Sequence, residues 1–350
     1  MKKIFMSNKF IHIKTAWFII PVILFLSCHN PVQPDNISPG TRNYTWTVDT
    51  IHVPRSTIIK MWGSSPSDIW GIAEAGEFDS TIYHFNGSNW TCDGILRSLS
   101  PKSIYGFSKD NIWIGDTEGK IWHFDGTVWS EFTTLNYILN KKNGWEGIWG
   151  ASPNDIYAVG AYIDDNGLFN NGVIAHYNGA KWELLSNVIL NISSSQIYRS
   201  SIDNKYYLDG FRWNPLGDSS FIQQFDSKNI KTLYSGAWGT SQFGEIALVG
   251  GEVLFILGRR IATYDGTNFH DVTYITEPRY DNGVIGRSKT DLFLWTLDGI
   301  AHYNGTDVQY LFRINSNERL QSAIIFDTQI IFTALDYNTG NTLIIKGVLK

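Results

Sequence analysis

The nine residues WGSSPSDIW (Trp62–Trp70) return later in the chain as WGASPNDIY (Trp149–Tyr157). Shorter copies keep the order of a large apolar residue, one or two turn residues and Ser or Thr: Tyr105–Ser108, Tyr198–Ser201, Trp238–Ser241, Ile285–Ser288 and Ile325–Thr328. The Ser or Thr positions of the seven copies are about 44 residues apart on average, which is the length of a four-stranded propeller blade. The repeat therefore predicts a β-propeller.

A second element recurs at a fixed distance after the first, beginning with IYHFNG (Ile82–Gly87). Its other copies are Ile121–Gly126, Ile174–Gly179, Ile222–Ser227, Ile261–Gly266 and Ile300–Gly305. The Asn-Gly and Asp-Gly pairs predict tight hairpins with type I′ turns. Each unit then consists of four short strands, which we name A to D in chain order. No window has sustained helical periodicity, so the chain is predicted to be all-β.

The two ends of the chain complement each other. The C-terminal unit has three predicted strands (residues 320–327, Gln329–Leu335 and Leu343–Val348), and the segment Tyr44–Val48 resembles a fourth strand with no unit of its own. An N-terminal strand that completes the last blade would close the ring and protect its open edge. We predict a seven-bladed β-propeller of four-stranded antiparallel blades. Because the fourth and seventh copies are weak, six or eight blades also fit the repeat.

The N-terminus predicts export. Four lysines and no acidic residue accompany an apolar run, Ala16–Leu26, which is too short to span a bilayer and has the length of a signal-peptide core. The following Ser27-Cys28 resembles the lipobox of bacterial lipoproteins, although Phe25 stands where that motif usually has Leu. The resemblance implies lipidation of Cys28, and an ordinary secretory signal is the alternative. We predict a signal peptide (1–27), a lipidated cysteine with a flexible tether (28–43) and a propeller domain (44–350).

Composition excludes some classes of function. Without residues 1–27 the chain has 24 basic and 33 acidic residues, a net charge of −9, because four of the 28 basic residues are removed. Clustered Lys and Arg bind nucleic acid, and such a cluster is not seen, so no nucleic-acid partner is predicted. If Cys28 is lipidated, Cys92 has no cysteine partner and the fold has no disulfide.

Two stretches carry a family resemblance: SPNDIYAVG (Ser152–Gly160) and IAHYNGAKW (Ile174–Trp182). They resemble the repeats of secreted bacterial β-propeller lipoproteins with SPNDIYAVG and IxHYNGxxW units, over roughly residues 44–350. The resemblance implies a cell-envelope protein, anchored by lipid to the outer membrane or secreted. It implies no established activity.

The repeated polar residues have structural explanations. Histidines occupy one repeat position in four units (His84, His123, His176 and His302). Equivalent positions on different blades cannot converge on one metal ion, so these rings are expected to hydrogen-bond a neighbouring blade or the backbone. Acidic residues follow the A–B turn in three units (Asp68, Asp155 and Asp291) and are expected to bind backbone amides there. No catalytic or cofactor motif is present, and no cofactor is predicted.

Function is expected on the face that carries the D–A and B–C connections, because these vary in length. Residues that break the repeat there are the candidate ligand-binding residues: Trp145, Tyr162, Tyr274, Arg279 and Tyr280. The pair Asp164 and Asp165 is a weak candidate for calcium.

The leading hypothesis is a non-catalytic, monomeric recognition or scaffold propeller that binds a protein or a glycan through the loop-rich face. One alternative is a glycan-active hydrolase or lyase with acidic residues at the mouth of the central channel. The other alternative is a structural component of the envelope. The fold does not choose among these hypotheses.

Overall fold

The computed structural model describes residues 38–350 except 75–76, 137–140, 164, 166, 169, 189, 214–218 and 238–241. The predicted lipidation site Cys28 and the calcium candidate Asp164 lie outside these residues. Within the described part, no helix is long and apolar enough to cross a membrane.

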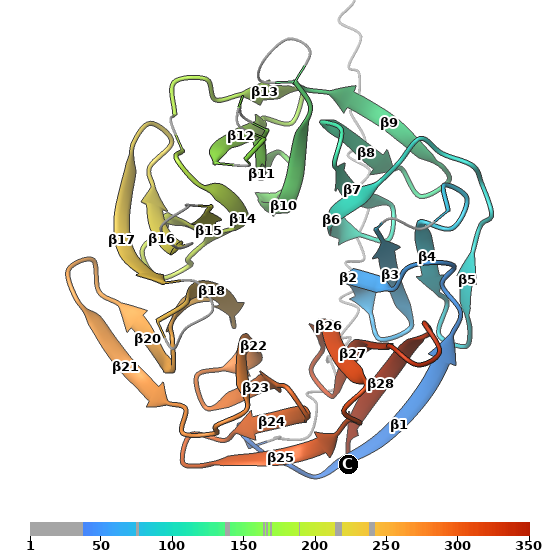
Figure 1. The fold of residues 1–350 in the computed structure, drawn as a ribbon, viewed down its shortest axis with the longest axis vertical. Coiled ribbons are helices and arrows are strands. Elements are labelled where there is room, and N and C mark those ends of the chain that lie inside the picture. The colour runs from blue at the N-terminus through green and yellow to red at the C-terminus, as the bar shows by residue number, and fades with distance from the viewer. Residues whose placement is uncertain are drawn as a thin grey trace, which may run out of the picture. The chain divides into compact units, whose positions relative to one another are not determined.

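The described chain forms seven four-stranded antiparallel sheets. Figure 1 shows these blades arranged in a ring. Strand A of each blade lies innermost and strand D outermost. Blades 1 to 3 contain β2 (Ile58–Ser65), β3 (Asp68–Ala73), β4 (Ile82–Phe85) and β5 (Trp90–Cys92); β6 (Pro101–Ser108), β7 (Asn111–Asp116), β8 (Lys120–Phe124) and β9 (Trp129–Thr134); and β10 (Asn143–Ser152), β11 (Asp155–Tyr162), β12 (Asn171–Tyr177) and β13 (Trp182–Leu184).

Blades 4 to 7 follow in the same order. They contain β14 (Ser193–Arg199), β15 (Tyr206–Arg212), β16 (Ser219–Phe225) and β17 (Ile230–Ala237); β18 (Gly244–Val249), β19 (Glu252–Leu257), β20 (Arg260–Tyr264) and β21 (Phe269–Tyr274); β22 (Tyr280–Ser288), β23 (Asp291–Thr296), β24 (Gly299–Tyr303) and β25 (Val308–Arg313); and β26 (Glu318–Ile325), β27 (Gln329–Asp336), β28 (Thr342–Leu349) and β1 (Tyr44–Ile51). The predicted seven-bladed, all-β fold is confirmed.

The N-terminal strand closes the ring, as predicted. β1 pairs antiparallel with β28 along its whole length, from Tyr44 opposite Leu349 to Ile51 opposite Thr342. The indole of Trp46 packs against the Phe312 ring of blade 6, with the ring centroids 5.4 Å apart. The last blade is therefore built from both ends of the chain, without a covalent link between its third and fourth strands.

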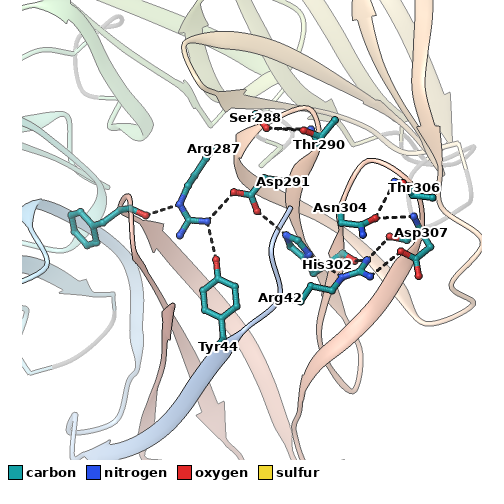
Figure 2. A network of polar contacts seen from close by, with 11 residues as sticks. Arg42, Tyr44, Arg287, Ser288, Thr290, Asp291, His302, Asn304, Thr306 and Asp307 are labelled. Atoms are coloured by element: carbon teal, nitrogen blue, oxygen red, sulfur yellow. Dashed lines mark hydrogen bonds and ion pairs between the residues drawn. The ribbon is translucent and has the colours of Figure 1, made fainter. Parts of the chain in front are cut away.

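A polar network, shown in Figure 2, fastens the start of β1 to blade 6. Arg42 Nη1 forms an ion pair with Asp307 at 2.8 Å, and Arg42 Nη2 donates to the carbonyl oxygen of His302 at 2.9 Å. Arg287 Nη1 donates to the Tyr44 hydroxyl and to Asp291 Oδ2, each at 3.0 Å. These side chains lock the closing strand in register.

One predicted strand end is wrong. The copy Trp238–Ser241 does not end strand A of blade 5, because that strand is β18. β18 ends instead at Gly250-Gly251, whose φ angles of +58° and +82° form a tight turn that only glycine adopts readily. A glycine pair thus replaces the Ser-containing turn of the other blades, and the repeat pattern misled the assignment.

The prediction of type I′ turns in the C–D hairpins is also wrong. In the C–D hairpins the glycine has a positive φ, for example +92° at Gly87, whereas the preceding Asn86 does not. The turn runs from Asn86 to Asn89, so Gly87 is its first central residue. A positive φ at that residue alone is the pattern of a type II′ turn. The Asn86 side chain instead accepts hydrogen bonds from the backbone amides of Ser88 and Asn89, each at 3.0 Å. The same arrangement recurs at Asp125, Asn178, Asp226, Asp265 and Asn304.

The ring has two unequal faces. Because the strands alternate in direction, the A–B and C–D turns share one face, and the D–A and B–C connections share the other. The turns of the first face, which we call the trimmed face, have two to four residues, except for the longer A–B turn at 200–205. The connections of the second face, the loop-rich face, reach eight residues at 74–81, 93–100, 135–142, 163–170 and 185–192.

Candidate functional site

Four of the five predicted ligand-binding residues lie in strands rather than loops, and two of these four, Trp145 and Tyr280, are buried. Trp145 is part of β10, has no solvent-exposed surface and packs into a core cluster with Trp113 and Trp182. Tyr280 begins β22, is buried, and its hydroxyl donates to the Asn282 carbonyl oxygen at 2.9 Å. The loop placement of both residues was wrong, because β10 and β22, the inner strands of blades 3 and 6, begin earlier than the turn residues suggested.

The other three lie at the loop-rich face. Tyr162 ends β11, partly buried, with the Lys141 ammonium 5.9 Å from the centre of its ring. Tyr274 ends β21 and is 58% exposed. Arg279 precedes β22, and its guanidinium is 3.2 Å from the Asp298 carboxylate. Tyr162 belongs to blade 3, whereas Tyr274 and Arg279 lie at the junction of blades 5 and 6. The three residues therefore do not belong to one cluster. Their role in ligand binding stays a prediction.

The calcium candidate has another partner. The exposed carboxylate of Asp165 forms an ion pair with Lys141. Among the described residues, no group of three or more His, Cys, Asp or Glu side chains is arranged to hold a metal ion.

The repeated histidines and acidic residues contact each other. The His84 ring nitrogen Nε2 is 2.7 Å from Asp68 Oδ1, and the same pairing recurs between His176 and Asp155 and between His302 and Asp291. In blade 2, His123 contacts Asn111 instead. The expectation that these carboxylates serve mainly backbone amides was wrong, because each joins strand B to strand C of its own blade. These pairs hold the blades together.

The central channel contains a cavity of about 640 Å³ with a wall from all seven blades. Its lining has two tiers. The half nearer the loop-rich face is polar, and the half nearer the trimmed face is largely aromatic and aliphatic. The polar tier includes Lys60, Ser103, Glu146, Ser195, Gln196, Glu245, Asp281, Gln321 and Ser322, and the other tier includes Trp62, Tyr105, Trp149, Tyr198, Leu248 and Ile285.

Irregular pairing of the inner strands accompanies the polar tier. In β2 the register with β3 shifts between Ile58 and Lys60, and in β14 the register with β15 shifts between Ser194 and Gln196. Corresponding shifts occur in β6, β10, β22 and β26. A bulge of this kind redirects side chains relative to strict alternation and is common at the rims of rings and barrels. The bulges therefore explain how the inner strands present polar side chains to the channel while their neighbours enter the core.

Charges are unevenly distributed around this mouth. Basic side chains come from β2 (Lys60), β6 (Lys102) and β26 (Arg319), on the neighbouring blades 7, 1 and 2. Carboxylates come from blades 3 to 6, on β10 (Glu146), β15 (Asp209), β18 (Glu245) and β22 (Asp281). Glu74 of blade 1 also lies beside Lys102, so these basic side chains lie on blades 7, 1 and 2, whereas carboxylates occur on both sides of the ring.

Some of these charges are paired across neighbouring blades. The Lys102 ammonium is 2.6 Å from Glu74 and 3.8 Å from Glu146, and Arg319 is 3.4 Å from Asp281. Lys60 is deeply buried, and burial lowers its pKa, although Glu146 and Asp209 act in the opposite direction.

Two carboxyl groups share one amide. Gln196 Nε2 donates to Asp209 Oδ2 at 3.0 Å and to Glu245 Oε1 at 3.2 Å. Burial raises the pKa of Asp209 to about 7, and burial together with the Asp209 charge raises the pKa of Glu245 to about 8. The pair therefore changes its protonation close to neutral pH.

Exposed apolar side chains gather on the loop-rich face. Among the described residues, the large apolar side chains most exposed in the connections of this face are Phe78, Ile95, Leu96, Ile163, Trp213, Leu297 and Tyr337. The turns of the trimmed face have two, Val128 and Ile202. These side chains are spread over the connections of several blades, and their greater number on this face favours it as the interaction face.

The channel residues were not predicted from the sequence, although the repeat contains a signal for them. A polar residue stands two or three positions before the large apolar residue of strand A in several repeats, as Lys60 does before Trp62 and Glu146 before Trp149. An alignment of the seven inner strands would have shown this column.

Comparisons with known proteins support the fold. No family model and no curated protein matches the chain. Among solved structures, YCF48 bound to D1 peptide is 15% identical with a TM-score of 0.63, covering 90% of this chain and 100% of that one. A catalytically inactive virginiamycin B lyase from Staphylococcus aureus with quinupristin is 15% identical with a TM-score of 0.61, covering 86% and 99%. The WD40 β-propeller domain of Doa1 is 10% identical with a TM-score of 0.53, covering 86% and 96%. At these identities the likeness shows a shared propeller fold alone.

Proposed function

We propose that this protein is a non-catalytic recognition propeller whose loop-rich face binds a segment of another protein. The observation that carries the proposal is the distribution of exposed apolar side chains, seven in the connections of the loop-rich face against two in the turns of the trimmed face. These side chains surround a channel mouth with both positive and negative charges. A surface of mostly aliphatic and mixed-charge character suits a protein segment better than a sugar, which favours aromatic platforms. The structural similarity to YCF48 in complex with a peptide agrees with this choice.

The glycan-active alternative has weaker support. An enzyme of that kind commonly uses two carboxyl groups that both reach the substrate. Glu245 lines the channel, but Asp209 is only 2% exposed and its Oδ2 is held by the Ile246 amide at 3.0 Å. The remaining carboxylates Glu146 and Asp281 lie within 4 Å of a cation. This arrangement favours binding over catalysis.

The prediction from this proposal uses two exposed leucines of the loop-rich face. Replacing both, Leu96→Ser and Leu297→Ser, is expected to weaken peptide binding at least ten-fold, because removing central apolar contacts commonly costs about 2 kcal/mol each. The control is Ile202→Ser on the trimmed face, since Ile202 is 72% exposed and Leu96 is 76% exposed.

The measurement starts from a displayed library of random dodecapeptides and a glycan array, both probed with residues 38–350. Affinities of enriched peptides are then measured for wild type and variants by calorimetry. Binding to glycans without enrichment of any peptide would contradict the proposal. An equal loss for Ile202→Ser would show that the loop-rich face is not the site.

We also propose that Cys28 is lipidated and that the protein is anchored in the cell envelope. The structure suggests which face would then be free. A Cβ atom on Gly40 would lie 2.7 Å from the carbonyl oxygens of Thr290 and Asn304, so the chain before β1 runs over the trimmed face of blade 6. The described chain therefore starts on the face opposite the loop-rich face.

Lipidation predicts that Cys28→Ala releases the protein from the membrane fraction without changing its melting midpoint. Metabolic labelling with an alkyne fatty acid is the measurement, and the unlabelled variant is the control. A wild-type protein that takes up no label would mean simple secretion.

A further inference from the structure

Glu245 differs from the other carboxylates of the channel mouth in having no cationic partner. Glu74 and Glu146 have Lys102, and Asp281 has Arg319. Within the described residues, no ion pair reaches Glu245, and the hydrogen bond found for its carboxyl is the one from Gln196 at 3.2 Å. Because Glu245 lines the cavity, a group that enters the channel can reach it.

A second observation comes from the wall behind Glu245. Asp209 is almost fully buried, and its Oδ1 atom has no hydrogen-bond partner among the described residues. Its other oxygen is bound to Gln196, the same amide that holds Glu245. Two carboxyl groups thus share one neutral side-chain donor, the Ile246 amide also donates to Asp209 Oδ2, and Lys60 of β2 is the cation that acts on both carboxyl groups. This side of the mouth therefore has more acceptor oxygens than donors, and neither carboxyl group has an ion pair among the described residues.

The tier below offers a complementary surface. Trp149 lies 6.1 Å from Tyr105 and 6.2 Å from Tyr198, measured between ring centroids, and Trp62 completes this aromatic part of the lining. Aromatic faces attract cations and also contact the methylene stem of a long side chain. A carboxyl group above aromatic rings is therefore suited to an ammonium or guanidinium group on an apolar stem.

We propose that the channel mouth is a pocket for one Lys or Arg side chain of the bound protein segment, with its cationic group on Glu245. The inference rests on the proposed function and adds the chemistry of the partner. The cavity of about 640 Å³ has room for such a side chain. Lys60 stands on the side of the ring with the basic side chains, its ammonium hydrogen-bonded to the Glu146 carbonyl oxygen, and directs the incoming cation toward blades 4 to 6.

Binding of the cation is linked to protons. The groups that act on Glu245 are Asp209 of β15, Lys60 of β2 and Asp281 of β22, with the Gln196 amide of β14. Burial and the nearby Asp209 raise the pKa of Glu245, so below about pH 8 the carboxyl is largely protonated in the free protein. A cation then has to displace that proton. Affinity is expected to rise from pH 6 to pH 9, a range in which lysine itself stays charged.

The test uses acetyl-Gly-Gly-Lys-Gly-Gly-amide and the same peptide with norleucine in place of lysine, titrated against residues 38–350 by calorimetry. The lysine peptide is expected to bind at least ten-fold more tightly at pH 9 than at pH 6, and the norleucine peptide is expected to show no such change. Glu245→Gln is expected to weaken binding of the lysine peptide at least ten-fold at pH 9 and to remove the pH dependence. The control Glu183→Gln changes an exposed carboxylate of β13 and should have no effect.

Four results would overturn the inference. They are equal binding of both peptides, no binding of the lysine peptide, unchanged binding by Glu245→Gln, and tighter binding of free 1,5-diaminopentane than of the lysine peptide, which would mark a small-amine site. Misfolding is not a concern for Glu245→Gln, because removal of an unfavourable buried charge should leave the melting midpoint at pH 9 equal or higher. If the peptides enriched on the loop-rich face lack Lys and Arg and ignore Glu245→Gln, this inference fails while the proposed function stands.

Discussion

Removal of residues 41–51 is expected to lower the melting midpoint by at least about 10 °C. The deletion exposes the whole edge of β28, which pairs with β1 over eight residues. It also removes the Trp46 and Tyr44 rings from the cluster that contains Phe293 and Phe332. Loss of a large buried aromatic side chain commonly costs about 3–5 kcal/mol, and each kcal/mol shifts the midpoint of a domain this large by roughly 2 °C.

A rearranged chain provides the matched control. The Lys350 amide donates to the Asn43 carbonyl oxygen at 2.8 Å, so the end of β28 and the start of β1 are adjacent. Placing residues 44–51 after Lys350 through a short Asp-Gly turn should therefore restore the midpoint, because strand D then follows strand C as in the other blades. Differential scanning calorimetry of the wild type, the deletion variant and the rearranged chain measures the three melting midpoints. An unchanged midpoint after deletion would show that the strand is dispensable for ring closure.

The fold could be predicted from the sequence because each repeat contains the strand and turn residues of one whole blade. The Asn-Gly pair at Asn86 and Gly87 needs a positive φ, and the residues around it alternate as a hairpin requires. The incomplete last unit and the orphan strand at Tyr44 could be matched because an unpaired edge is unfavourable. The turn preference of an Asn-Gly pair and the cost of an unpaired strand edge can both be judged without knowledge of distant contacts.

The candidate site was less predictable, for a structural reason. Trp145 and Tyr280 looked like loop residues because they break the repeat, but both begin inner strands and fill the core. Conversely, Lys60 and Glu245 looked like ordinary strand residues, yet they reach the channel. In six of the seven inner strands a register shift, such as the one between Ser194 and Gln196, helps decide which side chain turns inward, and such shifts are not visible in a pattern of alternation. β18, which carries Glu245, pairs with β19 without a shift.

The polar network that fastens the start of β1 to blade 6 leads to the second prediction with a large effect. Asp291 is buried and accepts hydrogen bonds from the His302 ring at 2.7 Å and from Arg287 at 3.0 Å, and Arg287 in turn holds the Tyr44 hydroxyl (Figure 2). Arg287 already has one buried nitrogen, Nη2, without a partner. Asp291→Ala removes the carboxylate that balances this cation and is expected to destabilise the fold by about 3–5 kcal/mol, as is usual when one partner of a buried ion pair is lost.

The pH dependence of this loss of stability separates the contribution of the Asp291 charge from that of its packing. Burial alone would raise the pKa of Asp291, but the hydrogen bonds from His302 and Arg287 outweigh it and hold the pKa below its usual value. A carboxyl whose pKa is lower in the folded protein stabilises the fold fully above its unfolded pKa, near 4, and loses that contribution as the pH falls through its folded pKa. The stability advantage of wild type over Asp291→Asn should therefore be constant from pH 7 to pH 5 and shrink below about pH 4. Urea unfolding across this range measures the difference, with Glu183→Gln as the control, since Glu183 is an exposed residue of β13 outside this network. An advantage that stays constant down to pH 3 would mean that Asp291 acts through its shape and hydrogen bonds, and that its charge does not stabilise the closing strand.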